Sequence, residues 1–188
     1  MGSEMCIRDS YSITLAGGFA GQAGVGGAVS TTVFSNDVEA GISQTKITEA
    51  SKIDVNATNT TNLEAITGGA GGGTVGVGAS VNTNVLNNTV KAFFNGGSAD
   101  VSDAITVKAQ TFDNFINTVT VSGAAGEVGV SGSVNTNVIS NSTDAYFNSV
   151  LTGTSNLTVD ASDIVEFKTI ADGAAGAGMA GVGMTVLV

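Results

Sequence analysis

Valine and small polar residues alternate along most of this chain, and the alternation returns at a fixed interval. The residues at Ser80–Val85 read Ser-Val-Asn-Thr-Asn-Val, and the same six residues return at Ser133–Val138. The flanks of both copies continue the alternation with a period of two. Such a period is typical of β-strands with one buried face. We therefore predict that Val81 and Val134 point inward at equivalent positions.

The interval of the repeat is 52 or 53 residues, as four equivalent valines show: Val29, Val81, Val134 and Val186. A second marker, apolar-x-Val-x-Ala, begins at Ile53, Ile105 and Leu157 and has the same interval. The chain therefore holds about three and a half copies. A constant period of this length indicates a repeat architecture.

Each copy contains short apolar segments separated by residues that favour turns. In the second copy these are Asn87–Thr89 and Asn95–Gly97. Gly, Thr, Val and Asn dominate where helix formers would be needed. We predict an all-β fold, a parallel β-solenoid (β-helix) built from about three and a half 52-residue repeats. We expect two coils per copy, hence about seven coils in a stack of roughly 30 Å, and a single domain over residues 11–188.

Asparagines recur in step with the valines, as the pairs Asn82/Asn135 and Asn84/Asn137. Stacked in register, their amides would form ladder hydrogen bonds. The alternative is that they lie on a polar face in contact with solvent.

Glycine and alanine runs also recur at one phase of the repeat: Gly68–Gly73, Gly123–Gly126 and Gly173–Gly178. Glycine within a strand often marks the close approach of another backbone. We expect a flat, tightly packed wall or a sharp corner of the coil. The uncharged segment Gly173–Val188 is short for a membrane span, and its counterparts carry Asn and Glu, so we expect no membrane insertion.

The first ten residues lie outside the repeat. Glu4–Ser10 resembles the translated end of a transposon adapter used in sequencing libraries; a short natural N-terminus is the alternative. We expect residues 1–10 to be an artefactual or disordered leader that makes few contacts with the body. Because the repeat is cut at both ends, we also expect a fragment of a longer protein.

The charge of the chain excludes several partners. Its net charge is −10, and its single cysteine, Cys6, and its single arginine, Arg8, both lie in the first ten residues. The remaining cations are five scattered lysines, which cannot build the basic patch that nucleic acid or anionic lipid requires. Disulfides cannot stabilise the body.

Few residues offer chemistry. Without histidine, a Ser-His-Asp or Cys-His arrangement and the usual zinc sites are excluded. Two carboxylate pairs, Asp100/Asp103 and Asp160/Asp163, could in principle cleave glycosides, but a pair at approximately equivalent positions of a repeat is more typical of solvated turns. With Asp172 they could alternatively bind calcium, although the GGxGxDxUx nonapeptide is absent. We therefore predict no catalytic, cofactor-binding or metal-binding residue.

Four aromatic residues occupy equivalent short strands: Phe93, Phe94, Tyr146 and Phe147. Stacking in the core is the simpler interpretation, and a platform for a ligand is the alternative.

The block from Val75 to Thr89, followed by Lys91-Ala-Phe-Phe and Ile105-Thr-Val-Lys-Ala, resembles the repeats of large Gram-negative surface proteins. These are the filamentous-haemagglutinin-like and leukotoxin-type adhesins, and the resemblance covers Ile13 to Val188. It implies a β-helical passenger, exported by an autotransporter or two-partner route, displayed at the cell surface and associated with virulence. It transfers no catalytic residue. Thr83 and Thr136 stand where that family often has valine.

We accordingly expect a non-enzymatic structural or stalk segment of a secreted adhesin or exoprotein. It would be extracellular, without a cofactor, stacked on further repeats of its parent chain, and in contact with a host or neighbouring-cell surface. A carbohydrate-active β-helix enzyme segment is the alternative, which a cleft with non-repeating carboxylates would favour. A trimeric autotransporter head would have a shorter repeat.

Overall fold

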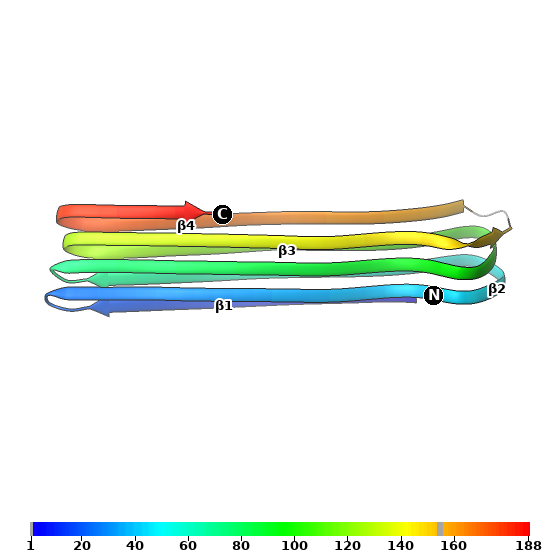
Figure 1. Cartoon of the computed structure of the whole chain (residues 1–188), viewed down its shortest axis with the longest axis horizontal. Coiled ribbons are helices and arrows are strands. Elements are labelled where there is room, and N and C mark those ends of the chain that lie inside the picture. The colour runs from blue at the N-terminus through cyan, green and yellow to red at the C-terminus, as the bar shows by residue number, and fades with distance from the viewer. Residues whose placement is uncertain (1, 154–155) are drawn as a thin grey trace.

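The computed structural model describes residues 2–153 and 156–188, with the side chains of 4–113, 117–153 and 156–188. This part of the chain is all-β and contains four long strands in one parallel sheet, ordered β1-β2-β3-β4 (Figure 1). Their bounds are β1 Gly2–Phe19, β2 Ala23–Gly72, β3 Val75–Thr152 and β4 Asn156–Leu187. The predicted parallel β-solenoid is confirmed.

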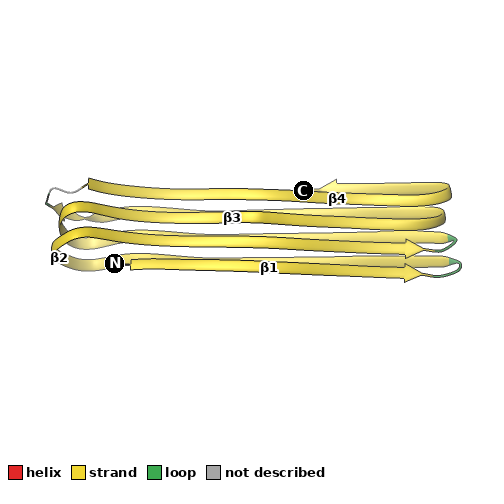
Figure 2. Ribbon diagram, turned by 180° about the vertical axis from the view of Figure 1, so that it is seen from behind, coloured by secondary structure: helices red, strands yellow, loops and turns green. Residues whose placement is uncertain are grey.

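Each coil consists of two nearly straight legs joined by tight bends (Figures 1 and 2). The outgoing legs are 23–43, 75–95, 128–148 and 180–187, and they pair with one another. The returning legs are 2–19, 53–72, 104–125 and 156–177, and they also pair with one another. The molecule is therefore a flat solenoid in which two layers of strands face each other across a narrow interior.

One repeat makes one coil, so the expectation of two coils per copy is wrong. Val29 pairs with Val81, Ile53 with Ile105 and Val134 with Val186, each one repeat apart. The segment Asn87–Thr89, predicted to turn, stays in the strand because Asn88 is buried and bonded within the interior. Legs of about 20 residues then reach roughly 70 Å, and about three and a half coils stack to roughly 17 Å.

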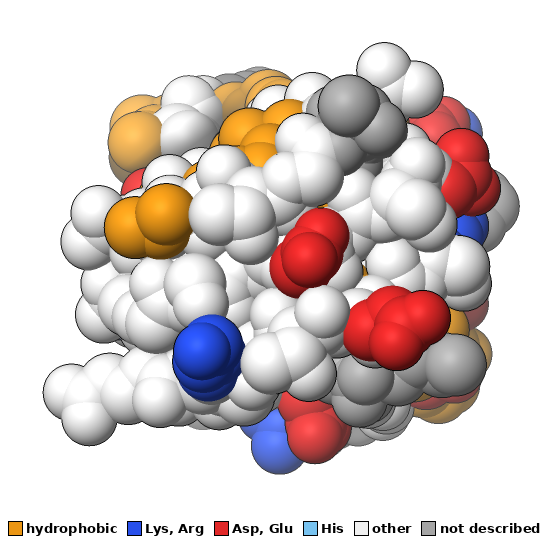
Figure 3. Space-filling model, turned by 90° about the vertical axis from the view of Figure 1, so that its right-hand side faces the viewer, with side chains coloured by type: hydrophobic (Ala, Val, Ile, Leu, Met, Phe, Trp, Pro, Cys, Tyr) orange, Lys and Arg blue, Asp and Glu red, His pale blue; other side chains and the backbone are white. Residues whose placement is uncertain are grey.

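At the end of the coils opposite the glycine-rich end, the bends contain residues with positive φ. Gly96 and Gly97 have φ of 73° and 82°, which confirms the turn predicted at Asn95–Gly97, and Gly153 has φ of 117°. In the first coil Gln44 holds this conformation with φ of 50°. Glycine adopts positive φ without a steric penalty. Figure 3 looks onto this end of the molecule and shows several acidic and basic side chains there.

The four equivalent valines lie on one line, as predicted, but they point outward rather than inward. Val29 is 70 % exposed and Val186 is 40 % exposed, whereas the alternating residues Ser80, Asn82 and Asn84 are buried. The predicted face is therefore wrong. The reason is the narrow interior, which leaves room only for small side chains and for amides that can hydrogen-bond to one another.

The spacing between the two layers of legs increases from the glycine-rich end of the coils to the opposite end, where the bends contain Gly96 and Gly97. A Cβ on Gly26 would lie 1.8 Å from the Ala70 carbonyl oxygen, and one on Gly69 would lie 1.9 Å from that of Ala79. The tightly packed wall expected from the glycine runs is thus confirmed. Near the bends the interior accommodates a hydrophobic core that includes Val55, Phe94, Val101, Ile105 and Val107. The interior is therefore wedge-shaped.

The N-terminal segment continues the solenoid. Residues Gly2–Ser10 of β1 pair with Val55–Leu63, so the expectation of few contacts is wrong. The side-chain pattern is nevertheless out of phase with the repeat. Glu4 and Arg8 occupy the register positions of the buried Ala57 and Thr61, while the outward residues of the segment include two apolar side chains, Met5 and Ile7, 69 % and 62 % exposed. The adapter origin of this segment stays a prediction.

Candidate functional site

A column of stacked amides runs through the middle of the interior. Asn36 donates from Nδ2 to Oδ1 of Asn88 at 2.8 Å, and Asn88 donates likewise to Asn141 at 3.1 Å. Each partner lies on the next coil of the outgoing legs. The column is thus a ladder with one asparagine per coil, at a position that the sequence had suggested was a turn.

The carboxylate of Asp113, on a returning leg, faces this column. Its Oδ1 accepts from Asn88 at 2.9 Å and its Oδ2 accepts from Asn141 at 2.8 Å. Asp113 is fully buried. Burial raises the pKa of its carboxyl, and the nearby charge of Asp163 adds to this, while the hydrogen bonds from Asn141, Thr61 and Asn88 oppose it. Sequence reasoning missed Asp113, because its counterparts in other coils are not acidic.

A second set of amides lies nearer the glycine-rich end and settles the question left open for the repeated asparagines. Asn82 donates to Asn135 at 3.4 Å and Asn84 to Asn137 at 2.9 Å, inside the molecule. Thr118 and Thr169 on the returning legs bond to the same amides. The ladder interpretation is confirmed, and the solvent-facing alternative is wrong.

This second ladder begins at the second coil and does not extend to the first. The side-chain oxygens of Asn82 and Asn84 have no hydrogen-bond partner among the described residues. Their register partners there are Ser30 and Thr32, which carry no amide. The first copy lacks the Asn-Thr-Asn motif, and the orphaned oxygens are the structural consequence.

The carboxylates considered for catalysis or calcium binding do not gather. Asp100 and Asp103 are exposed beside a bend. Asp160 lies 3.6 Å from the amino group of Lys108, and Asp163 accepts from Asn141 at 2.9 Å. Asp160 pairs in register with Lys108, and Asp163 with Thr111, so the expected equivalence with the pair Asp100/Asp103 is wrong. Among the described residues, no group of three or more acidic or cysteine side chains could hold a metal ion. Asp172 lines an open groove with glycines and alanines.

The four aromatic residues form two pairs, which lie on opposite faces of the same two neighbouring outgoing legs. Phe94 is buried and packs on Phe147 with ring centroids 5.3 Å apart and the rings tilted by 45°, which confirms that this pair packs in the core. Phe93 and Tyr146 stack in parallel on the outer face, with centroids 5.4 Å apart and an interplanar angle of 10°. Tyr146 is 41 % exposed, so core stacking is wrong for the second pair.

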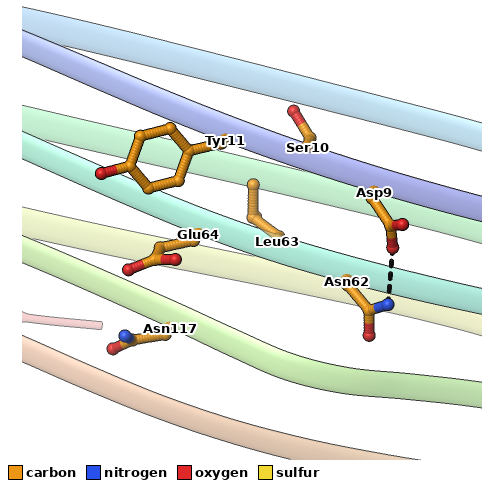
Figure 4. A pocket seen from close by; sticks show the side chains of 7 residues that line it. All are labelled: Asp9, Ser10, Tyr11, Asn62, Leu63, Glu64 and Asn117. Atoms are coloured by element: carbon orange, nitrogen blue, oxygen red, sulfur yellow. Dashed lines mark hydrogen bonds between the residues drawn. The ribbon is translucent and has the colours of Figure 1, made fainter.

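An open groove of about 470 Å³ lies on the outer face of the returning legs (Figure 4). Tyr11, Glu64 and Asn117 occupy one register line across three successive coils of its wall. Asn62 donates to Asp9 at 2.6 Å beside them. These side chains differ from coil to coil, in contrast to the interior ladders. The groove therefore holds carboxylates that do not repeat.

The outer face of the outgoing legs is apolar near the glycine-rich end. Eleven valines stand there in three rows, each row crossing successive coils. Between the first two rows lie Gly27, Ala79 and Gly132, followed by Met184 in the last coil, and between the second and third rows lie Thr31, Thr83 and Thr136. We call this surface the valine face, and its valines are Val25, Val77, Val130 and Val182, then Val29, Val81, Val134 and Val186, then Val33, Val85 and Val138.

No protein-family model, curated protein or solved structure matches this chain. Within residues 2–153 and 156–188 there is also no helix with the length and apolar character needed to cross a bilayer.

Proposed function

We propose that this chain is a non-enzymatic structural segment of a secreted bacterial adhesin or exoprotein, displayed outside the cell, where it presents a broad surface to host or neighbouring cells. The observation that supports this most is the recurrence of one side chain at one place on successive coils. Asn36, Asn88 and Asn141 hydrogen-bond in a column in the interior, and Phe94 packs on Phe147. A reaction needs a unique arrangement of groups, whereas these ladders serve the stack itself.

The dimensions of the coil favour presentation of area over extension. A 52-residue coil advances the stack by only ~4.8 Å, while each leg spans roughly 70 Å. Each added repeat therefore adds a long strip to both flat faces of the molecule and lengthens the stack by only ~4.8 Å. In this role the segment would stack on further repeats of its parent chain, because both terminal coils carry strands with one unpaired edge.

The proposal is tested by adding a coil. Residues 75–127 are duplicated, and the original and lengthened chains are displayed on a non-adherent bacterium. We expect attachment to host cells, or between bacteria, to increase with the extra coil, because the presented area increases. Equal attachment by both forms, with equal amounts on the surface, would contradict the proposal.

A second candidate function is a carbohydrate-active β-helix. The groove that holds Asp9, Tyr11, Glu64 and Asn117 is the observation that favours it, since its carboxylates do not repeat. Glycoside cleavage uses two carboxyl groups on opposite sides of the bond. Its test is the release of reducing ends from a panel of polysaccharides by the purified chain, by Glu64→Gln and by Asp9→Asn, with Asp103→Asn as the matched control. Cleavage that is lost in the first two variants and kept in the control would replace the structural assignment.

A further inference from the structure

We propose that the valine face is the contact surface for a second copy of this chain, which packs its own valine face against it. The inference rests on the shape and composition of this surface alone, so it holds or fails independently of the proposed function.

The valine face exposes a large apolar area. Val25 and Val29 are each 70 % exposed, Val33 is 62 % exposed and Val182 is 59 % exposed. Contiguous apolar patches beyond a few hundred Å² are rare on isolated soluble proteins and mark sites of contact. The interior beneath this surface is filled by glycine and polar ladders, so each valine contacts only its row neighbours, and no other element of the described chain covers the valine face.

The rows and the groove of the valine face are complementary in shape to those of a second valine face. Two rows of valines, represented by Val77 and Val81, stand on either side of a row that is small in the first three coils and ends at Met184 in the fourth. A Cβ placed on Gly27 or Gly132 would meet nothing nearer than a carbonyl oxygen at 3.9 Å, so the groove between the rows is open. A valine row from a facing sheet can enter this groove. Two sheets that pack face to face interdigitate their side chains in this way, about 10 Å apart.

The area is sufficient for a stable pair. Four legs at ~4.8 Å spacing, over about ten residues at ~3.4 Å rise, make a patch of roughly 650 Å². Two such patches bury about 1,300 Å², which lies within the range of ~1,200–2,000 Å² for specific protein–protein interfaces.

The distribution of charge selects this face for contact between copies. The chain carries a net charge of −10, so two copies repel over most of their surface. The outgoing legs carry no Asp, Glu, Lys or Arg within residues 23–36, 75–90, 128–143 and 180–188. Here two acidic molecules can meet without burying like charges. A flat sheet with regular rows also complements a second flat sheet better than it complements a fluid lipid surface.

The test is sedimentation velocity of the purified chain across a concentration series. We expect a species of twice the 18.5 kDa chain mass at the upper concentrations. The double variant Val81→Glu with Val134→Glu should sediment as the monomer with an unchanged circular dichroism spectrum, because it places charges in the middle of the face. The matched control, Thr89→Glu with Ser142→Glu, changes outward residues of the same two legs beyond the face and should still dimerise.

A second measurement does not depend on the folding of the glutamate variants. In a Cys6→Ser background, Thr83→Cys lies on the valine face and Thr89→Cys lies beyond it. A bis-maleimide should link two copies through the former far faster than through the latter. A wild-type chain that is monomeric at every concentration, or equal cross-linking of the two cysteine variants, would overturn the proposal. Binding of a monomeric wild type to neutral phosphatidylcholine vesicles, lost in the glutamate variant, would overturn it in favour of a lipid surface.

Discussion

Single side chains in this solenoid are selected by the width of the interior at their position along the leg. Near the glycine-rich end a Cβ on Gly26 would overlap the Ala70 carbonyl oxygen. At the opposite end of the coils the interior is wide enough for Phe94, which is fully buried. Between them, amides such as Asn88 bond to the next coil. Polar groups can be buried there because each coil supplies the partner for the next, which removes most of the cost of desolvation.

Asp113 makes the stability of the chain depend on pH. Burial raises the pKa of its carboxyl in the folded state, so its contribution is most favourable below the ordinary value of 3.8 and is lost as the pH rises through the raised folded value. We expect Asp113→Asn to lessen the fall in melting temperature between acidic and neutral pH. Thermal melts across pH, with the exposed Asp103→Asn as control, measure this. A wild type and an Asp113→Asn variant with the same pH dependence would contradict the expectation.

Two neighbouring glycines offer a matched comparison of the inside and the outside. Gly26 faces the opposite backbone, whereas Gly27 lies on the open outer surface. We expect Gly26→Ala to destabilise by about 1–3 kcal/mol, as overpacking does, and to lower the melting temperature by roughly 2–4 °C per kcal/mol. Gly27→Ala should change stability by no more than ~0.5 kcal/mol. If both variants melted alike, the two layers would not be in contact at this end.

At the scale of the elements, pairing register and side-chain pattern disagree in the first half of β1. Its residues Glu4 and Arg8 occupy inward positions, while Met5 and Ile7 lie outside. Backbone pairing there is opposed by the entropy of ordering each residue, ~1–2 kcal/mol. In this segment the burial of apolar side chains contributes little to the free energy of folding that would offset this cost.

This mismatch predicts that a graft stabilises the first coil. Replacing residues 4–10 by the sequence of residues 57–63 restores the inward pattern of the next coil, and the melting temperature should rise. Deleting residues 2–10 should lower it by only a few degrees, since ~1 kcal/mol corresponds to about 2–4 °C. Differential scanning calorimetry distinguishes these cases. A graft that melts below the wild type would show that the present residues suit their positions.

The sequence was sufficient to predict strands and the period, but not the length of the strands or which face of each strand is buried. The alternation around Val81 predicts a strand correctly, yet period two alone leaves two choices, and hydrophobicity favours the wrong one. The glycine runs contained the missing information, because a wall without Cβ atoms leaves no room for valine inside. At the other end, Ile105 and Val107 are buried as their apolar character suggests. The number of coils was missed because Asn88 resembles a turn residue when its ladder partners are unknown.

At the scale of the molecule, the stack is held together by contacts between neighbouring coils. β2 and β4 each pair with β3 along nearly their whole length, at a nearly constant offset. Such arrays have stabilities that sum over nearest neighbours. The open groove that holds Glu64 and the valine face lie on opposite layers, so variants of one should not perturb the other.

One coil per repeat has a mechanical consequence. A terminal coil pulled away along the stack shortens the folded part by only ~4.8 Å, yet its 52 residues extend to about 180 Å at ~3.3–3.6 Å each. Each detachment therefore releases nearly forty times the length it removes. When the chain is stretched between its ends in optical tweezers, it should extend in a few large steps of equal size, one for each detached coil. A tether made of such coils would dissipate sudden loads while the remaining coils stay folded.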